Sequence, residues 1–97
     1  MIIVAGHLRV AVESRESYLT AVAAVAVLAR DAAGCLDFVQ APDPLDRERI
    51  NIYERWETDA DLELFRSSGD PDEPGTDLPD VLAADVHKYR ISSVEAP

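Results

Sequence analysis

The chain has 97 residues, of which 47% are hydrophobic and 29% are charged, a composition typical of one folded domain over residues 1–97 and not of a disordered chain. Its formal net charge of −10, with only nine Lys and Arg residues, argues against nucleic acid and anionic membranes as partners, because phosphate groups bind to basic surfaces. Its single cysteine, Cys35, cannot form an internal disulfide, so we expect a reducing, cytoplasmic location.

The N-terminal part of the chain predicts a strand, a helix and a second strand. Residues 2–10 alternate between two faces as a strand does, and they do not resemble a signal sequence. Ser14 is the expected N-cap of a helix that continues to about Ala32, because apolar side chains recur on one helical face and Gly34 follows as a stop. A second strand should span residues 35–40. No apolar run in the sequence approaches the ~20 residues that cross a bilayer.

The middle of the chain predicts a turn, a third strand and a second helix. Residues 41–46 contain two prolines and two aspartates, which do not continue a strand ladder, so they should form a turn. A strand should follow over residues 49–57. Thr58 and Asp61 have the spacing of a capping box, so a helix should begin there and end near Ser68.

The C-terminal part predicts an acidic loop, a short helical turn and a last strand. Residues 70–79 carry three prolines and one glycine and should form a solvated loop, in which Pro74 stands where a calcium loop requires a ligand. Residues 80–84 should form the helical turn and residues 86–94 the fourth strand. The order strand, helix, strand, strand, helix, strand predicts a ferredoxin-like α+β fold, with a four-stranded antiparallel sheet and both helices on one face.

The face of this sheet that the helices leave uncovered is expected to be half apolar. It would carry Ile3, Ala5 and Tyr53, with His7 and Arg55 beside them. An exposed sheet face of this size and character usually contacts a partner. We therefore expect a homodimer.

Three segments of the chain resemble the antibiotic biosynthesis monooxygenase family, in the right order and spacing. They are residues 2–10, residues 34–38 and residues 51–57, and the most specific feature is a Glu and a Trp two residues apart, here Glu54 and Trp56. The resemblance covers nearly the whole chain. It implies a dimeric α+β barrel in which two sheets pack face to face, with a pocket between each sheet and its helices.

The chemistry that the resemblance implies differs among family members. Some oxidise polycyclic phenols or quinols with molecular oxygen, using no metal, flavin or haem, whereas others degrade haem or isomerise small sugars. The haem-degrading members carry a haem-binding His on the helix after the Trp, where this chain has residues 65–67 and no His, so haem chemistry is not expected. Residues 70–79 also differ from the pocket-closing segment of many relatives, which leaves the substrate open.

Oxidation without a cofactor needs a pocket that binds an electron-rich ring, accepts a proton and excludes water. The catalytic candidates are Glu54, Trp56 and Tyr89. Glu54 would act as a base if burial raised its pKa, and Trp56 would stack on the ring and donate from its indole N–H. The alternative for this pair is structural, with Trp56 filling the core and Glu54 anchoring a helix end or an Arg. Tyr89 would donate or accept a proton, and His87 beside it fits an edge-strand or interface side chain.

Other apolar side chains are candidates either for lining the pocket or for filling the core. The substrate-binding candidates are Leu36, Phe38, Ile52 and Phe65. Cys35 fits a small buried thiol better than a nucleophile, and the two histidines and one cysteine show no metal-ligand spacing. No metal is therefore expected, and the family resemblance implies that no cofactor is needed.

Three functions agree with this sequence. The first is a cofactor-independent monooxygenase that oxidises a small aromatic phenol, quinol or polyketide-like compound with O2. The second is a non-catalytic dimeric module that binds an aromatic metabolite in the same pocket. The third is a small-molecule isomerase, which needs an acid and a base but no oxygen. Dependence on O2 separates the first function from the other two.

Overall fold

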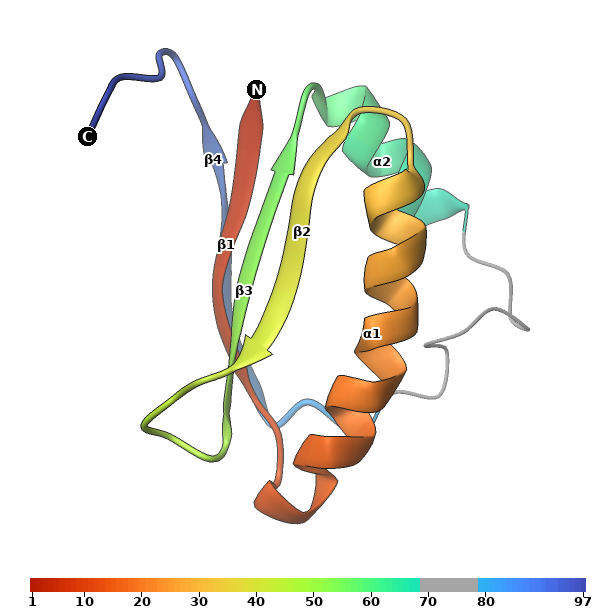
Figure 1. Ribbon diagram of the computed structural model, residues 1–97, viewed down its shortest axis with the longest axis vertical. Helices are drawn as coiled ribbons and strands as arrows, with labels where there is room; N and C mark the ends of the chain where they lie inside the picture. The colour runs from red at the N-terminus through yellow and green to blue at the C-terminus, as the bar shows by residue number, and fades with distance from the viewer. Residues whose placement is uncertain (69–78) are drawn as a thin grey trace.

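The computed structural model describes residues 1–68 and 79–97, which form one four-stranded antiparallel sheet with two α-helices on one side (Figure 1). The strands are β1 (Ile2–Arg9), β2 (Cys35–Pro42), β3 (Arg49–Trp56) and β4 (Ala83–Arg90). The helices are α1 (Arg15–Asp31) and α2 (Asp59–Ser67). The strand order β2-β3-β1-β4 confirms the ferredoxin-like α+β prediction. Within the described residues, neither helix has the length and apolar character that crossing a membrane requires.

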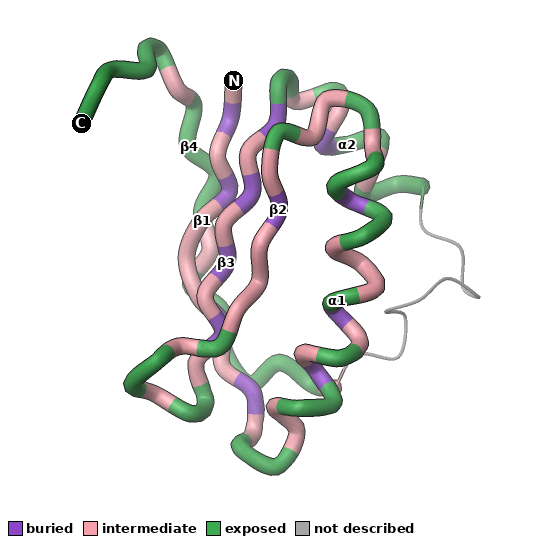
Figure 2. Tube along the Cα trace, in the orientation of Figure 1, coloured by how far each residue is buried: buried purple, intermediate pink, exposed green. Residues whose placement is uncertain are grey.

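Alternation along the strands divides the sheet into a helix-facing side and an open side. On β1 and β3 the buried positions recur at every second residue, with Gly6 as the exception (Figure 2). They are Ile2, Val4, Leu8, Ile50, Ile52, Glu54 and Trp56. Because successive side chains of a strand point to opposite faces, these lie under the helices, and the residues between them lie on the open side.

Among the described residues, two groups of buried side chains fill the space between the sheet and the helices. The first packs against α1 and consists of Leu8, Val10, Tyr18, Val22, Ile50 and Ile52. The second packs against α2 and consists of Ile2, Val4, Trp56 and Leu62. Val86 of β4 contacts both groups and links them into one core.

The start of α1 differs from the sequence-based prediction. A short 3-10 turn, Val12–Ser14, precedes the helix, and the Ser14 side chain makes no capping hydrogen bond. Ser14 has helical backbone angles, whereas a capping residue needs an extended backbone to turn its side chain onto the first N–H groups. Ser14 therefore occupies the predicted N-cap position, but its side chain does not cap the helix.

Strand β2 is longer and less regular than predicted. It continues to Pro42, which pairs with Ile50, although the sequence predicts a turn from residue 41. Because β2 is an edge strand, a proline without an N–H is tolerated there. The register shifts between Cys35 and Asp37, and Leu36 at this irregularity is 42% exposed. Leu36 therefore does not share the buried environment that the sequence predicts for it.

The segment before β4 also differs from the prediction. The sequence predicts a helical turn over residues 80–84, but Ala83 and Ala84 belong to β4 and residues 80–82 are not helical. The Leu82 N–H donates to the carbonyl oxygen of Arg9 at 2.7 Å, which places this segment alongside β1. The expected acidic loop and the rejected calcium loop fall almost entirely on residues 69–78, outside the described residues.

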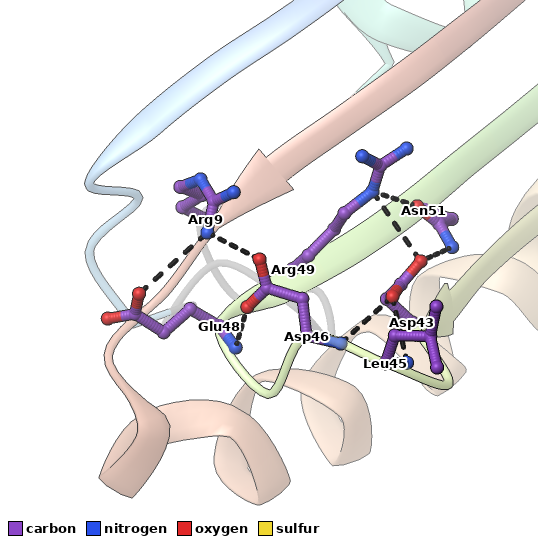
Figure 3. Close-up of polar contacts among 7 residues, drawn as sticks. All are labelled: Arg9, Asp43, Leu45, Asp46, Glu48, Arg49 and Asn51. Atoms are coloured by element: carbon purple, nitrogen blue, oxygen red, sulfur yellow. Dashed lines mark hydrogen bonds and ion pairs between the residues drawn. The ribbon is translucent and has the colours of Figure 1, made fainter.

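The turn between β2 and β3 is organised by carboxylates (Figure 3). Oδ2 of Asp43 accepts hydrogen bonds from the N–H groups of Leu45 and Asp46, both at 2.9 Å. Oδ1 of Asp43 accepts from Nδ2 of Asn51 at 2.9 Å, the main reason why the pKa of Asp43 lies below its usual range. Asp46 in turn pairs with Arg9 of β1 at 2.9 Å. These bonds connect the turn to β3 through Asn51 and to β1 through Arg9. They therefore help to fix the register of the β2–β3 hairpin, which carries the candidate site.

Candidate functional site

Glu54 is a charged side chain in an otherwise apolar part of the core, with 9% of its surface exposed. It lies two residues before Trp56 on β3, so both side chains point toward the helices. Nε1 of the fully buried Trp56 donates a hydrogen bond to Oε1 of Glu54, with 3.1 Å between the two atoms. The strand itself therefore arranges an acid and its hydrogen-bond donor.

Two phenylalanines add aromatic surface to this pair. Phe38 of β2 lies across from Glu54 in the β2–β3 register. The ring centroid of Phe65 on α2 is 5.4 Å from that of Trp56 and 6.4 Å from that of Phe38, distances at which aromatic rings attract each other. We call Phe38, Glu54, Trp56 and Phe65 the aromatic cluster. All four are candidates from the sequence, and the fold brings them together from three elements.

The electrostatic environment of Glu54 favours its protonated form more than water does. Burial raises the pKa of Glu54 above its ordinary value of 4.5. The hydrogen bond from Trp56 and the positive charge of Arg66 on α2 lower the pKa but do not cancel the effect of burial. A carboxylate with a raised pKa is a stronger base than one in water, as proton abstraction from a bound ligand requires.

The remaining sequence-predicted candidates lie outside the aromatic cluster. Ile52 belongs to the core group that packs against α1. Leu36 lies at the irregular start of β2 and is exposed. Tyr89 of β4 pairs with Ile3 of β1, so it lies on the open side of the sheet and is 50% exposed. The sheet therefore separates Tyr89 from Glu54.

The histidine candidate lies away from the aromatic cluster, whereas Cys35 lies beside it, opposite Trp56 in the β2–β3 register. His87 lies on the open side beside Tyr89, and its Nε2 is 2.8 Å from Oδ1 of Asp85. Burial raises the pKa of the Cys35 thiol, which makes the nucleophilic thiolate less available. Across residues 1–68 and 79–97, no three His, Cys, Asp or Glu side chains are placed to hold a metal ion together.

Two features beside the cluster were not predicted from the sequence. Asp59, in the first turn of α2, accepts hydrogen bonds from Nη1 of Arg90 at 2.6 Å and Nζ of Lys88 at 2.9 Å, which lower its pKa to about 2. Arg66, in the last turn of α2, places its charge near Glu54. The ion pairs of Asp59 had one signal in the sequence: Lys88 and Arg90 lie two residues apart, on one face of a strand, and α2 begins with acidic residues.

Comparisons with known proteins agree with this architecture. The family model described as Antibiotic biosynthesis monooxygenase matches residues 1–73. No curated protein matches the chain at a significant level.

Three of the similar solved structures are of proteins assigned by name to the antibiotic biosynthesis monooxygenases. The protein from Deinococcus radiodurans is 17% identical with a TM-score of 0.81, and the match covers 100% of this chain and 98% of that one. The protein from Nitrosomonas europaea is 15% identical with a TM-score of 0.79, covering 96% and 100%. The protein from Chloroflexus aurantiacus is 21% identical with a TM-score of 0.73, covering 98% and 96%. At these identities the likeness shows the fold.

Proposed function

Because this chain belongs to the antibiotic biosynthesis monooxygenase family, we propose that it oxidises a small aromatic phenol or quinol with molecular oxygen and without a bound cofactor. The observation that supports the proposal most is the buried carboxyl group of Glu54, held by the Trp56 indole N–H among aromatic rings. Such a cluster offers an apolar surface for a flat ring and one group that accepts a proton.

Glu54 is the base in this proposal. Its carboxylate takes the proton of the substrate hydroxyl, and the electron pair of the broken O–H bond stays on the substrate as a phenolate. The raised pKa of Glu54 brings its proton affinity closer to that of a phenol, which makes the transfer less unfavourable. Tyr89 has no part in this step because it lies on the other side of the sheet.

The phenolate itself supplies the electrons that reduce O2. A C–O bond forms between O2 and an electron-rich ring carbon, and loss of water from the resulting hydroperoxide leaves a quinone. One oxygen atom of O2 ends in the quinone and the other in water. The two hydrogen atoms of that water come from the hydroxyl group and from the ring carbon, so the reaction balances without a further reductant.

The aromatic side chains bind and shield the substrate in this scheme. Trp56 and Phe38 form the buried wall of the cluster. Phe65 is its partly exposed ring and comes from α2, so we place ligand entry on the Phe65 side. Exclusion of water around the phenolate protects the oxygenated intermediate from side reactions. We also propose that the protein acts as a homodimer that packs through the open side of the sheet.

Oxygen uptake by the purified protein tests the proposed function. Anthrones, naphthols and hydroquinones are offered as substrates in the presence of a metal chelator. We expect uptake well above the uncatalysed rate, reduced about a hundredfold in Glu54→Gln, because loss of a general base typically costs that much or more. Trp56→Phe should also reduce the rate, since it removes the donor to Glu54.

Glu57→Gln is the matched control, because Glu57 directly follows the end of β3 and is exposed. Its rate should equal that of the unchanged protein. Absence of uptake, together with saturable quenching of Trp56 fluorescence by the same compounds, would replace the monooxygenase by a binding module. Trp56 is the single tryptophan of the chain, so its fluorescence reports on this cluster alone.

A further inference from the structure

We infer that Arg66 is a specificity-determining residue that selects aromatic ligands carrying an anionic oxygen, either a phenolate or a carboxylate on the ring. The inference rests on the proposed function, because it assumes that the aromatic cluster is where the ligand binds. It adds the chemical class of that ligand. No motif in the sequence assigns a role to Arg66.

The helical position of Arg66 places it over the aromatic cluster. Leu62, four residues earlier, is fully buried in the core group that packs against α2. Phe65, the preceding residue, packs against the Trp56 ring at 5.4 Å. Residues separated by three or four positions share a helix face, so Arg66 lies one turn beyond Leu62, at the solvent-facing edge of the cluster. Its side chain is exposed and free to reach a ligand that enters beside Phe65.

The charge of Arg66 lowers the pKa of Glu54, and no carboxylate of the described residues pairs with it. Its positive charge acts on Glu54 across the cluster. No carboxylate of the described residues forms an ion pair with it, whereas Arg9, Arg49 and Arg90 all have such pairs. Glu54 itself is held by the Trp56 indole. Within residues 1–68 and 79–97, no carboxylate therefore competes for the guanidinium with an anion that enters the cluster.

The net negative charge of the whole chain makes the local positive charge of Arg66 important for an anionic ligand. The net charge of −10 repels anions at long range, so an anionic ligand needs a local positive charge to be retained. A guanidinium is planar and presents paired donors that match the two oxygens of a carboxylate and also bind a phenolate. On the reaction path, Arg66 would stabilise the negative oxygen that remains when Glu54 takes the proton.

Calorimetric titration with two naphthalene probes of the same shape tests the inference. The probes are 2-naphthoate, which is anionic, and 2-naphthamide, which is neutral. We expect the unchanged protein to bind the naphthoate about fivefold more tightly than the amide. This ratio corresponds to the upper end of the range of binding energies of a partly exposed ion pair. In Arg66→Gln this ratio should fall to about one, with the affinity for the amide unchanged. Arg66→Lys should keep part of the preference.

Arg47→Gln is the control for charge alone, because Arg47 is an exposed arginine of the β2–β3 turn that pairs with no carboxylate in the described part of the chain. Its naphthoate preference should remain. Equal binding of both probes by the unchanged protein, or a preference that survives in Arg66→Gln, overturns the role of Arg66 and leaves the aromatic cluster as the binding site. Failure of both probes to bind the unchanged protein overturns the proposed site and this inference with it.

Discussion

The proposed chemistry depends on one residue, Glu54, whose carboxyl group is the base. Two alternatives were open for it in the sequence, a base in a pocket or an anchor for a helix end or an Arg. The structure places it in the core with the Trp56 indole as its hydrogen-bond donor, and burial raises its pKa. A buried group of this kind lowers the stability of the folded protein when it is ionised, a cost that often accompanies a functional site.

The raised pKa predicts how stability depends on pH. The folded state binds the Glu54 proton more tightly than the unfolded state, so the contribution of Glu54 is most favourable below 4.5 and is lost as pH rises through the folded pKa. Glu54→Gln keeps the size of the side chain and an oxygen for the Trp56 N–H, but it cannot ionise. We therefore expect the free energy of unfolding of Glu54→Gln to increase relative to that of the unchanged protein as pH rises from 5 to 8. The increase should exceed the ~0.5 kcal/mol within which most surface substitutions fall.

Urea unfolding at several pH values measures this difference. Glu57→Gln should follow the unchanged protein at every pH, because Glu57 is exposed. A stability difference between Glu54→Gln and the unchanged protein that does not vary with pH would show that Glu54 has the same pKa in the folded and unfolded chains.

Helix α2 is the element that completes the aromatic cluster, and it depends on tertiary contacts for its stability. With nine residues it is too short to be stable as an isolated helix. Oγ1 of Thr58 accepts from the N–H of Asp61 at 3.1 Å, which confirms the cap predicted from the sequence. Asp59 binds Lys88 and Arg90 of β4. These contacts fix the helix start, and Leu62 fixes the face that it turns to the sheet.

Two leucines of α2 test how the helix is held. Leu62 is fully buried, whereas Leu64 is 64% exposed. We expect Leu62→Ala to destabilise the protein by about 2–5 kcal/mol, because it removes buried methyl groups and leaves a cavity beside Trp56. Leu64→Ala should change the free energy of unfolding by no more than about 0.5 kcal/mol. Thermal or urea unfolding measures both, and similar effects of the two changes would contradict this placement of α2.

At the scale of the whole molecule, the two sides of the sheet have different roles. The helix-facing side holds the core and the aromatic cluster. The open side carries Ile3, Ala5 and Tyr53 in neighbouring register positions, half-buried, with the exposed Tyr89 beside Ile3. An apolar sheet face of this kind supports the proposed homodimer, since a chain of this length buries only a modest core by itself.

A charge at the centre of the open side should prevent this association. Ala5 lies between Tyr53 and His87 in the register, so Ala5→Glu would place two carboxylates near the two-fold axis of a face-to-face dimer. We expect the dimer dissociation constant to rise at least about a hundredfold, the effect of roughly 3 kcal/mol. Ala23→Glu on the exposed surface of α1 is the matched control. Analytical ultracentrifugation measures both, and an unchanged protein that sediments as a monomer would contradict the dimer.

Much of the fold and part of the site could be predicted from local patterns. The order of strands and helices follows from the change of hydrophobic period along the chain, and the common face of Glu54 and Trp56 follows from their separation by two on a strand. The cap at Thr58 depends on side chains three residues apart. Each of these features depends only on residues close together in the chain, so local patterns are sufficient to predict it.

Other features depend on residues that are distant in the sequence and follow from how the strands and helices pack together. The irregularity at Leu36 and the extension of β2 to Pro42 depend on pairing with β3. The face of Tyr89 depends on the register of β4 against β1, because β4 has little hydrophobic alternation of its own. The contact of Phe65 with Trp56 and the charge of Arg66 near Glu54 depend on where α2 packs. Register and helix packing are set by partner elements, so local periodicity identified the buried carboxylate but not the residues that surround it.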